Sequence, residues 1–169
     1  MSAAEHLEHP IAPVYDGRSR VLLLGSFPSP ASREAGFFYG HPRNRMWKVL
    51  AAVTGEAAVP STVEERRAFL LRERIAMYDV AASCTIEGAS DASIRDVVPT
   101  DLAPIFSAAP VLAVFTTGGV ASRLYRACQL PATGVEDVRL PSTSAANASW
   151  SLEALVEAYA RALAPCLRL

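Results

Sequence analysis

The chain has 169 residues, of which 51% are hydrophobic and 20% are charged, and its formal net charge is −1. A chain of this length suits one domain, so we expect a single domain over residues 1–169 with residues 1–17 as an N-terminal extension. The charge argues against a protein that coats nucleic acid, and no apolar run approaches the roughly 20 residues of a membrane span.

The N-terminus and the cysteines predict the compartment and the cofactor content. No basic segment followed by an apolar segment opens the chain, so we expect a cytoplasmic protein. Cys84, Cys128 and Cys166 are odd in number and widely spaced, which favours reduced thiols over disulfides or an iron–sulfur cluster. We therefore expect no cofactor and no metal, and we take a monomer as the default.

Short apolar runs, each ending at polar residues or glycine, predict four buried strands. In chain order they cover residues 21–25, 75–80 and 111–118, with a weaker run at 138–144. Between and after them, apolar residues recur at helical spacing over residues 46–53 and 152–163. The sequence thus alternates strand and helix patterns.

Local signals predict three further helices. Ser61 and Glu64 have the spacing of a capping box ahead of an apolar segment at residues 69–71. Gly118 and Gly119 open another periodic segment, and a short helix is expected near Thr100.

This alternation predicts an α/β fold, a three-layer α/β/α sandwich around a central, mostly parallel four-stranded sheet. In such sheets ligands bind at the carboxyl ends of the strands. That rule brings together four segments: the loop after Leu24, the turn after Asp79, the turn at residues 116–119 and the loop after Leu140. We expect the functional site there.

The first of these loops carries an aromatic triplet, residues 37–39, followed by a short basic segment with Arg43, Asn44 and Arg45. Aromatic faces beside an amide and two guanidiniums suit a flat heterocycle next to a phosphate. Taken alone, such a triplet is more often core or loop packing, and Asn44 a helix cap.

Two ordered motifs carry a resemblance to a known family. Residues 25–47, GSFPSPASREAGFFYGHPRNRMW, resemble the first motif of the uracil-DNA glycosylase superfamily, and residues 40–47 are similar to the His-Pro-x-Asn-Arg-Phe-Trp signature of its mismatch-specific branch. Residues 140–148, LPSTSAANA, resemble the second motif. The combination is most similar to the hypoxanthine-DNA glycosylase branch, which implies DNA containing a deaminated base as the partner and no cofactor.

The resemblance also implies roles for residues of the first motif. Several branches place a water-activating carboxylate or Asn just after the first strand, where this chain has Phe27. The hypoxanthine branch implies Asn44 as the catalytic residue, whose amide can orient a water or hold a base edge but is no strong base. The base-binding set around it comprises Ser26 and the backbone around Phe27 as donors to the base, with Phe38, Tyr39 and His41, of which His41 is alternatively a turn residue.

The second motif suits contact with DNA that is distorted around a flipped nucleotide. The DNA-binding set expected from both motifs is Arg43, Arg45, Ser142, Thr143, Ser144 and Asn147. Two positions depart from the family pattern: Ala145 stands where proline is usual, and Met46 where an aromatic is usual. Without the resemblance, the second motif reads as a turn and a helix cap.

Several alternatives remain open on the sequence. Asp79, and Asp91 in a predicted polar loop, are well-placed carboxylates that more often cap turns. The chain could instead be a uracil or mismatch-specific glycosylase, a catalytically inert module that binds damaged DNA, or a small-molecule hydrolase using Ser26. No lysine lies in either motif, so we expect a monofunctional enzyme without lyase activity.

Overall fold

The structure, a computed structural model, describes residues 3–168 and contains two sheets and seven helices within them. The strands are β1 (Ala4–Glu8), β2 (Val21–Gly25), β3 (Ile75–Asp79), β4 (Ala81–Glu87), β5 (Ser90–Pro99), β6 (Ala113–Thr117) and β7 (Asp137–Leu140). The helices are α1 (Pro30–Ala35), α2 (Met46–Thr54), α3 (Val63–Arg72), α4 (Ala103–Ala108), α5 (Gly119–Cys128), α6 (Leu130–Thr133) and α7 (Leu152–Leu167). Across residues 3–168, no helix has the length and apolar character needed to cross a membrane.

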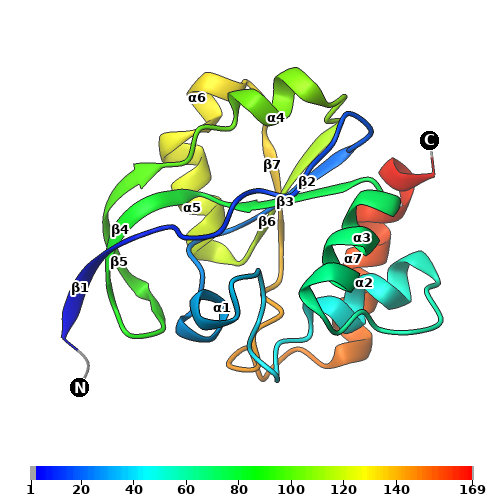
Figure 1. Cartoon of the computed structure of the whole chain (residues 1–169), viewed down its shortest axis with the longest axis horizontal. Coiled ribbons are helices and arrows are strands. Elements are labelled where there is room, and N and C mark those ends of the chain that lie inside the picture. The colour runs from blue at the N-terminus through cyan, green and yellow to red at the C-terminus, as the bar shows by residue number, and fades with distance from the viewer. Residues whose placement is uncertain (1–2, 169) are drawn as a thin grey trace.

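The central sheet has the predicted four parallel strands, in the order β3-β2-β6-β7. Figure 1 shows α2, α3 and α7 together on one side of this sheet and α4, α5 and α6 on the other. The prediction of a three-layer α/β/α sandwich is therefore confirmed. The carboxyl ends of all four strands meet at one edge, which is where the two motif loops begin.

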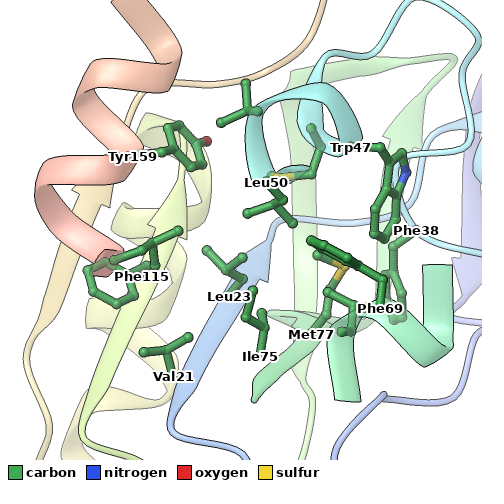
Figure 2. Packing of buried hydrophobic residues seen from close by; sticks show 14 of the residues in the cluster. Val21, Leu23, Phe38, Trp47, Leu50, Phe69, Ile75, Met77, Phe115 and Tyr159 are labelled. Atoms are coloured by element: carbon green, nitrogen blue, oxygen red, sulfur yellow. The ribbon is translucent and has the colours of Figure 1, made fainter. Parts of the chain in front are cut away.

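The central strand β2 divides the core between the two faces of the sheet. Because side chains alternate along a strand, Val21 and Leu23 pack on the side of α2, α3 and α7, and Leu22 and Leu24 pack on the other side. Figure 2 shows Leu23 among the apolar side chains of the first cluster. Full burial of each such side chain stabilises the fold by about 1.5–3 kcal/mol, which fixes the strand ends that carry the loops.

A second sheet was not predicted from the sequence. It is antiparallel, with strand order β1-β4-β5, and a hairpin turn at Gly88 (φ 57°) joins β4 to β5. The expectation that Asp91 lies in a loop is wrong, since it lies near the start of β5. An antiparallel ribbon can leave one face to water, so its polar sequence lacks the continuous apolar run that marks a buried strand.

The N-terminal segment packs against the rest of the fold. β1 pairs with β4, and Val14 exchanges two backbone hydrogen bonds with Met77, of 3.0 and 2.9 Å. Ile11 and Val14 are buried in the same core cluster as Val21 and Leu23 of β2. The expected N-terminal extension therefore contacts both sheets.

Local boundaries differ from the predictions by a few residues. The capping box of α3 uses Thr62 and Glu65, one residue later than predicted, because the Glu65 carboxylate accepts the N–H groups of both Ser61 and Thr62. The fourth strand ends at Leu140, since Pro141 follows it. The helix expected near Thr100 begins at Ala103.

Candidate active site

A cavity of about 990 Å³ opens at the carboxyl edge of the central sheet. The loops after β2, β6 and β7 form it together with the end of β3 and the turn of the β4–β5 hairpin. It brings together nearly all of the residues expected from the sequence: Ser26, Phe27, Phe38, Tyr39, His41, Arg43, Asn44, Ser142, Thr143, Ser144 and Asn147. Arg45 is the one expected residue that does not line the cavity.

Asn44 joins the two motif loops through its side-chain oxygen. Oδ1 accepts the N–H of Met46 at 2.9 Å and the hydroxyl of Thr143 at 2.8 Å. A backbone N–H can only donate, so the oxygen of the amide must face it, and both lone pairs of that oxygen are then occupied. The Nδ2 group has no hydrogen-bond partner among residues 3–168. Asn44 therefore offers the cavity two N–H donors rather than an acceptor.

Arg45 holds the second motif loop instead of facing the cavity. Its guanidinium donates to the carbonyl oxygens of Ser144 at 2.8 Å and Asn147 at 3.1 Å, and also to that of Trp150. Its backbone N–H donates to Thr143 O at 3.1 Å. These bonds engage the Arg45 guanidinium with carbonyl groups of the second motif loop, and its expected contact with DNA phosphates stays a prediction.

The second motif loop is also fixed by its own side chains. Thr143 is 1% exposed, and the Asn147 amide donates to Ser142 O at 2.9 Å, so both residues position the loop. Ser142 Oγ and Ser144 Oγ each accept a backbone N–H at 3.2 Å. Within the described chain their hydroxyl protons have no acceptor, so both serines can donate to a phosphate.

Ser26 is paired with a carboxylate that the sequence reading placed elsewhere. Its hydroxyl donates to Asp91 Oδ2 at 2.7 Å, so it is not free to donate to a base as expected. Desolvation by the surrounding protein raises the pKa of Asp91, the charge of Asp79 adds to the rise, and the bond from Ser26 opposes it. Asp91 thus enters the site from the unpredicted hairpin.

A second carboxylate that lines the cavity, Asp79, is paired with His9. Asp79 is 4% exposed, and its Oδ2 lies 2.7 Å from His9 Nε2. His9 Nδ1 accepts the N–H of Ile11 at 3.2 Å, which places the proton of the neutral ring on Nε2, donated to Asp79. Sequence reasoning missed His9, because no residue near it in the sequence indicates that it pairs with Asp79, 70 positions away.

Tyr39 also lines the cavity, and its backbone has a left-handed conformation (φ 49°). Its hydroxyl lies 3.0 Å from Thr117 Oγ1. Burial raises the pKa of Tyr39 well above its ordinary value, with Asp79 adding to the rise, so the phenol stays protonated. A Cβ at Gly25 would lie 2.5 Å from Asp79 Oδ1 and 3.1 Å from the Tyr39 hydroxyl, so only glycine fits there.

The two phenylalanines expected to bind a base are mainly core residues. Phe38 is 1% exposed and Phe27 is 5% exposed, and the His9 ring packs against both, with ring centroids 6.1 and 5.9 Å away. A stacking platform must expose a ring face, so these rings can offer a base only the small part that reaches the cavity wall.

Cationic side chains line the cavity beside these carboxylates. Arg43 and His41 are exposed, and His41 Nδ1 accepts the N–H of Arg43 at 3.0 Å, which supports the turn role of His41. Sequence reasoning missed Arg139, which lies one residue before the end of β7. Its guanidinium lies over Gly119 at the start of α5, where an added Cβ would be 2.9 Å from Nη2. Among residues 3–168 neither Arg43 nor Arg139 forms an ion pair.

The arrangement suits a nucleotide whose base enters the cavity and whose phosphates meet Arg43 and Arg139. Within the described residues no group of three or more His, Cys, Asp and Glu side chains could hold a metal ion.

Comparisons with known proteins point to one family. A family model described as the uracil DNA glycosylase superfamily matches residues 12–164. A protein of Methanosarcina barkeri named hypoxanthine DNA glycosylase is 33% identical over 80% of this chain and 85% of its own length. A protein of the same name from Methanosarcina acetivorans is 30% identical over 82% and 87%. The solution NMR structure of a candidate uracil DNA glycosylase from Methanosarcina acetivorans aligns with a TM-score of 0.75 and 26% identity, over 91% of this chain and 97% of the other.

Proposed function

The chain belongs to the uracil DNA glycosylase superfamily, and from that premise we propose that it hydrolyses the N-glycosidic bond of deoxyinosine in DNA and releases hypoxanthine. One observation carries the proposal: Asn44 lines the cavity and its NH2 group has no hydrogen-bond partner among residues 3–168, while Phe27 occupies the position of the usual water-activating residue. The names of the two Methanosarcina relatives support hypoxanthine as the base.

Asn44 acts on the departing base in this proposal. As the bond from C1′ to N9 breaks, its electron pair moves onto the purine, and the amide N–H groups donate to an acceptor atom of the hypoxanthine ring. A donor that is already held in place stabilises this charge without reorganisation, because Met46 and Thr143 fix the amide oxygen. Stabilisation that develops only in the transition state raises kcat.

DNA is held around the flipped nucleotide by a small set of donors. We assign the flanking phosphates to Arg43, Arg139 and the hydroxyls of Ser142 and Ser144, all of which line the cavity. Phosphate contacts position the DNA, and a small footprint fits a chain of net charge −1. Arg45 keeps the second motif loop in register with Asn44.

The reaction stops at base release. A lyase step needs an amine that forms a Schiff base with the sugar. Lys48, the only lysine of the sequence, is exposed on α2, and no lysine is among the described residues that line the cavity. The product is then an intact strand with an abasic site.

The test uses end-labelled DNA with one deoxyinosine or one deoxyuridine, single- and double-stranded, incubated with wild type or Asn44→Ala and then treated with alkali. We expect alkali-dependent cleavage at inosine that falls about 10²–10³-fold in the variant. Cleavage at uracil alone would contradict hypoxanthine as the substrate. Cleavage without alkali would contradict the monofunctional reaction, and binding without base release would indicate an inert module.

A further inference from the structure

The proposed reaction leaves one role without a residue. Water must reach C1′ and lose a proton, yet Phe27 has no polar group. The oxygen of Asn44 already accepts hydrogen bonds from Met46 and Thr143, so it has no lone pair left for a water. Another acceptor in the cavity has to hold this water.

We propose that Asp91 is the catalytic residue that binds the attacking water and takes its proton, an inference that rests on the proposed glycosylase function. Asp91 is exposed and lines the cavity. Its Oδ2 accepts the Ser26 hydroxyl at 2.7 Å, which fixes the carboxylate, and its Oδ1 has no hydrogen-bond partner within residues 3–168. Oδ1 is therefore available to accept a bond from water.

The other carboxylate of the cavity is less suited to this role. Asp79 is 4% exposed, and its Oδ2 is bonded to the His9 ring. Its Oδ1 lies against Gly25, at 2.5 Å from where a Cβ would stand. Asp79 is therefore engaged at both oxygens, whereas Asp91 keeps one carboxylate oxygen without a hydrogen-bond partner among the described residues.

Burial and the charge of Asp79 increase the affinity of Asp91 for a proton. Asp79 from β3 and Tyr39 from the first motif loop interact electrostatically with Asp91. Cys84 from β4 also interacts with Asp91, and it lies within range of the charge of Arg33 on α1. Desolvation and the charge of Asp79 raise the pKa of Asp91, while the Ser26 bond opposes the rise. A carboxylate with a raised pKa is the stronger base, provided that it remains ionised at the working pH.

The step balances with water as the only co-reactant. The C1′–N9 bond breaks, and its electron pair leaves with hypoxanthine. The water oxygen forms the new bond to C1′ while one water proton passes to Asp91 Oδ1. The base then takes a proton from solvent, and Asp91 returns its proton to solvent. The products are neutral hypoxanthine and an abasic sugar with a hydroxyl at C1′.

The experiment compares wild type, Asp91→Asn, Asp91→Ala and Asp96→Asn. Asparagine at position 91 keeps an oxygen for the Ser26 hydroxyl and removes only the base. Asp96 is a matched control, because it is an exposed aspartate of the same strand outside the cavity, with a φ of 53° that asparagine also adopts. Single-turnover base release from deoxyinosine DNA is measured from pH 4 to 9 with and without sodium formate, and binding is measured with a non-hydrolysable analogue.

We expect Asp91→Asn to lower the single-turnover rate at least about 100-fold, with DNA affinity within about threefold of wild type and Asp96→Asn unchanged. The wild-type rate should fall as pH drops through the raised pKa of Asp91, and the pH–rate profile of Asp91→Asn should lack this fall. Formate should partly restore the rate of Asp91→Ala.

If both Asp91 variants release the base at near-normal rates, Asp91 is not the residue that activates water. Base release by wild type in the same experiment would leave the proposed glycosylase function standing. Loss of affinity equal to the loss of rate, with no rescue by formate, would make Asp91 structural. Absence of base release by wild type would overturn both proposals.

Discussion

Replacement of Asn44 by aspartate tests separately the two functions of its amide, the oxygen that accepts hydrogen bonds and the NH2 group that donates them. In Asn44→Asp a carboxylate oxygen still accepts the N–H of Met46 and the hydroxyl of Thr143, and only the NH2 donors are lost. In Asn44→Ala both acceptor bonds are lost as well. Both variants therefore lack the NH2 donors, and only Asn44→Ala also lacks the two bonds that the oxygen accepts.

The stability difference follows from the two bonds. Each contributes about 1 kcal/mol, so Asn44→Ala should lower the free energy of unfolding by about 2 kcal/mol. Asn44→Asp should be at least as stable as wild type, because a negative charge beside the first N–H groups of α2 interacts favourably with the helix dipole. Urea denaturation at pH 7 measures both values.

The activities should not follow the stabilities. If Asn44 donates to the departing base, both variants lose about 2.7–4 kcal/mol of transition-state stabilisation, or about 10²–10³-fold in the single-turnover rate on deoxyinosine DNA. If the oxygen of Asn44 activates water instead, aspartate should restore or exceed the wild-type rate. An active Asn44→Asp would therefore refute the donor role.

Three further variants test the supporting structure. Arg45→Met should speed hydrogen exchange over residues 143–150 and lower base release at least about 10-fold, because the carbonyl groups of that loop lose their common donor; unchanged exchange would contradict this. Arg139→Gln should weaken DNA binding and reduce the salt slope of log K by about 1, whereas Arg161→Gln on α7 should not; equal slopes would remove Arg139 from the interface. Asp137→Ala should lower the free energy of unfolding at pH 7 by about 2–4 kcal/mol, because it leaves the buried hydroxyls of Thr116 and Ser122 without an acceptor.

The Asp137 effect should also depend on pH. Burial acts to raise the pKa of Asp137, but the hydrogen bonds from Thr116, Arg126 and Ser122 outweigh it and hold the pKa below its ordinary value. A lowered folded-state pKa gives stability that is present above the unfolded-state value of about 4 and is lost as pH falls through the folded value. The difference between wild type and variant in urea should therefore shrink below about pH 4, and a constant difference would contradict the assignment.

The sequence predicts the central sheet well because its signals are local. The run at residues 21–25 is apolar throughout, since β2 is covered on both faces, and its predicted bounds are those of the strand. The two motif loops follow strands of that sheet, so the rule for parallel sheets places them at one cavity.

The pairs that define the chemistry of the cavity are not local, and the sequence does not reveal them. Ser26 and Asp91 are 65 positions apart, and His9 and Asp79 are 70 apart. The hairpin that carries Asp91 has one polar face and no continuous apolar run. Arg45 has the composition of a phosphate ligand, and only the fold shows that the carbonyl groups of the second motif loop take its donors.

The most direct test of the central claim identifies the base that is released. Wild-type enzyme is incubated with an equimolar mixture of otherwise identical DNA duplexes carrying deoxyinosine or deoxyuridine, and free bases are quantified by mass spectrometry over time. We expect hypoxanthine to be released faster than uracil, and we expect the strands to stay intact without alkali. Preferential release of uracil would contradict the substrate, and release of neither base would contradict the proposed reaction.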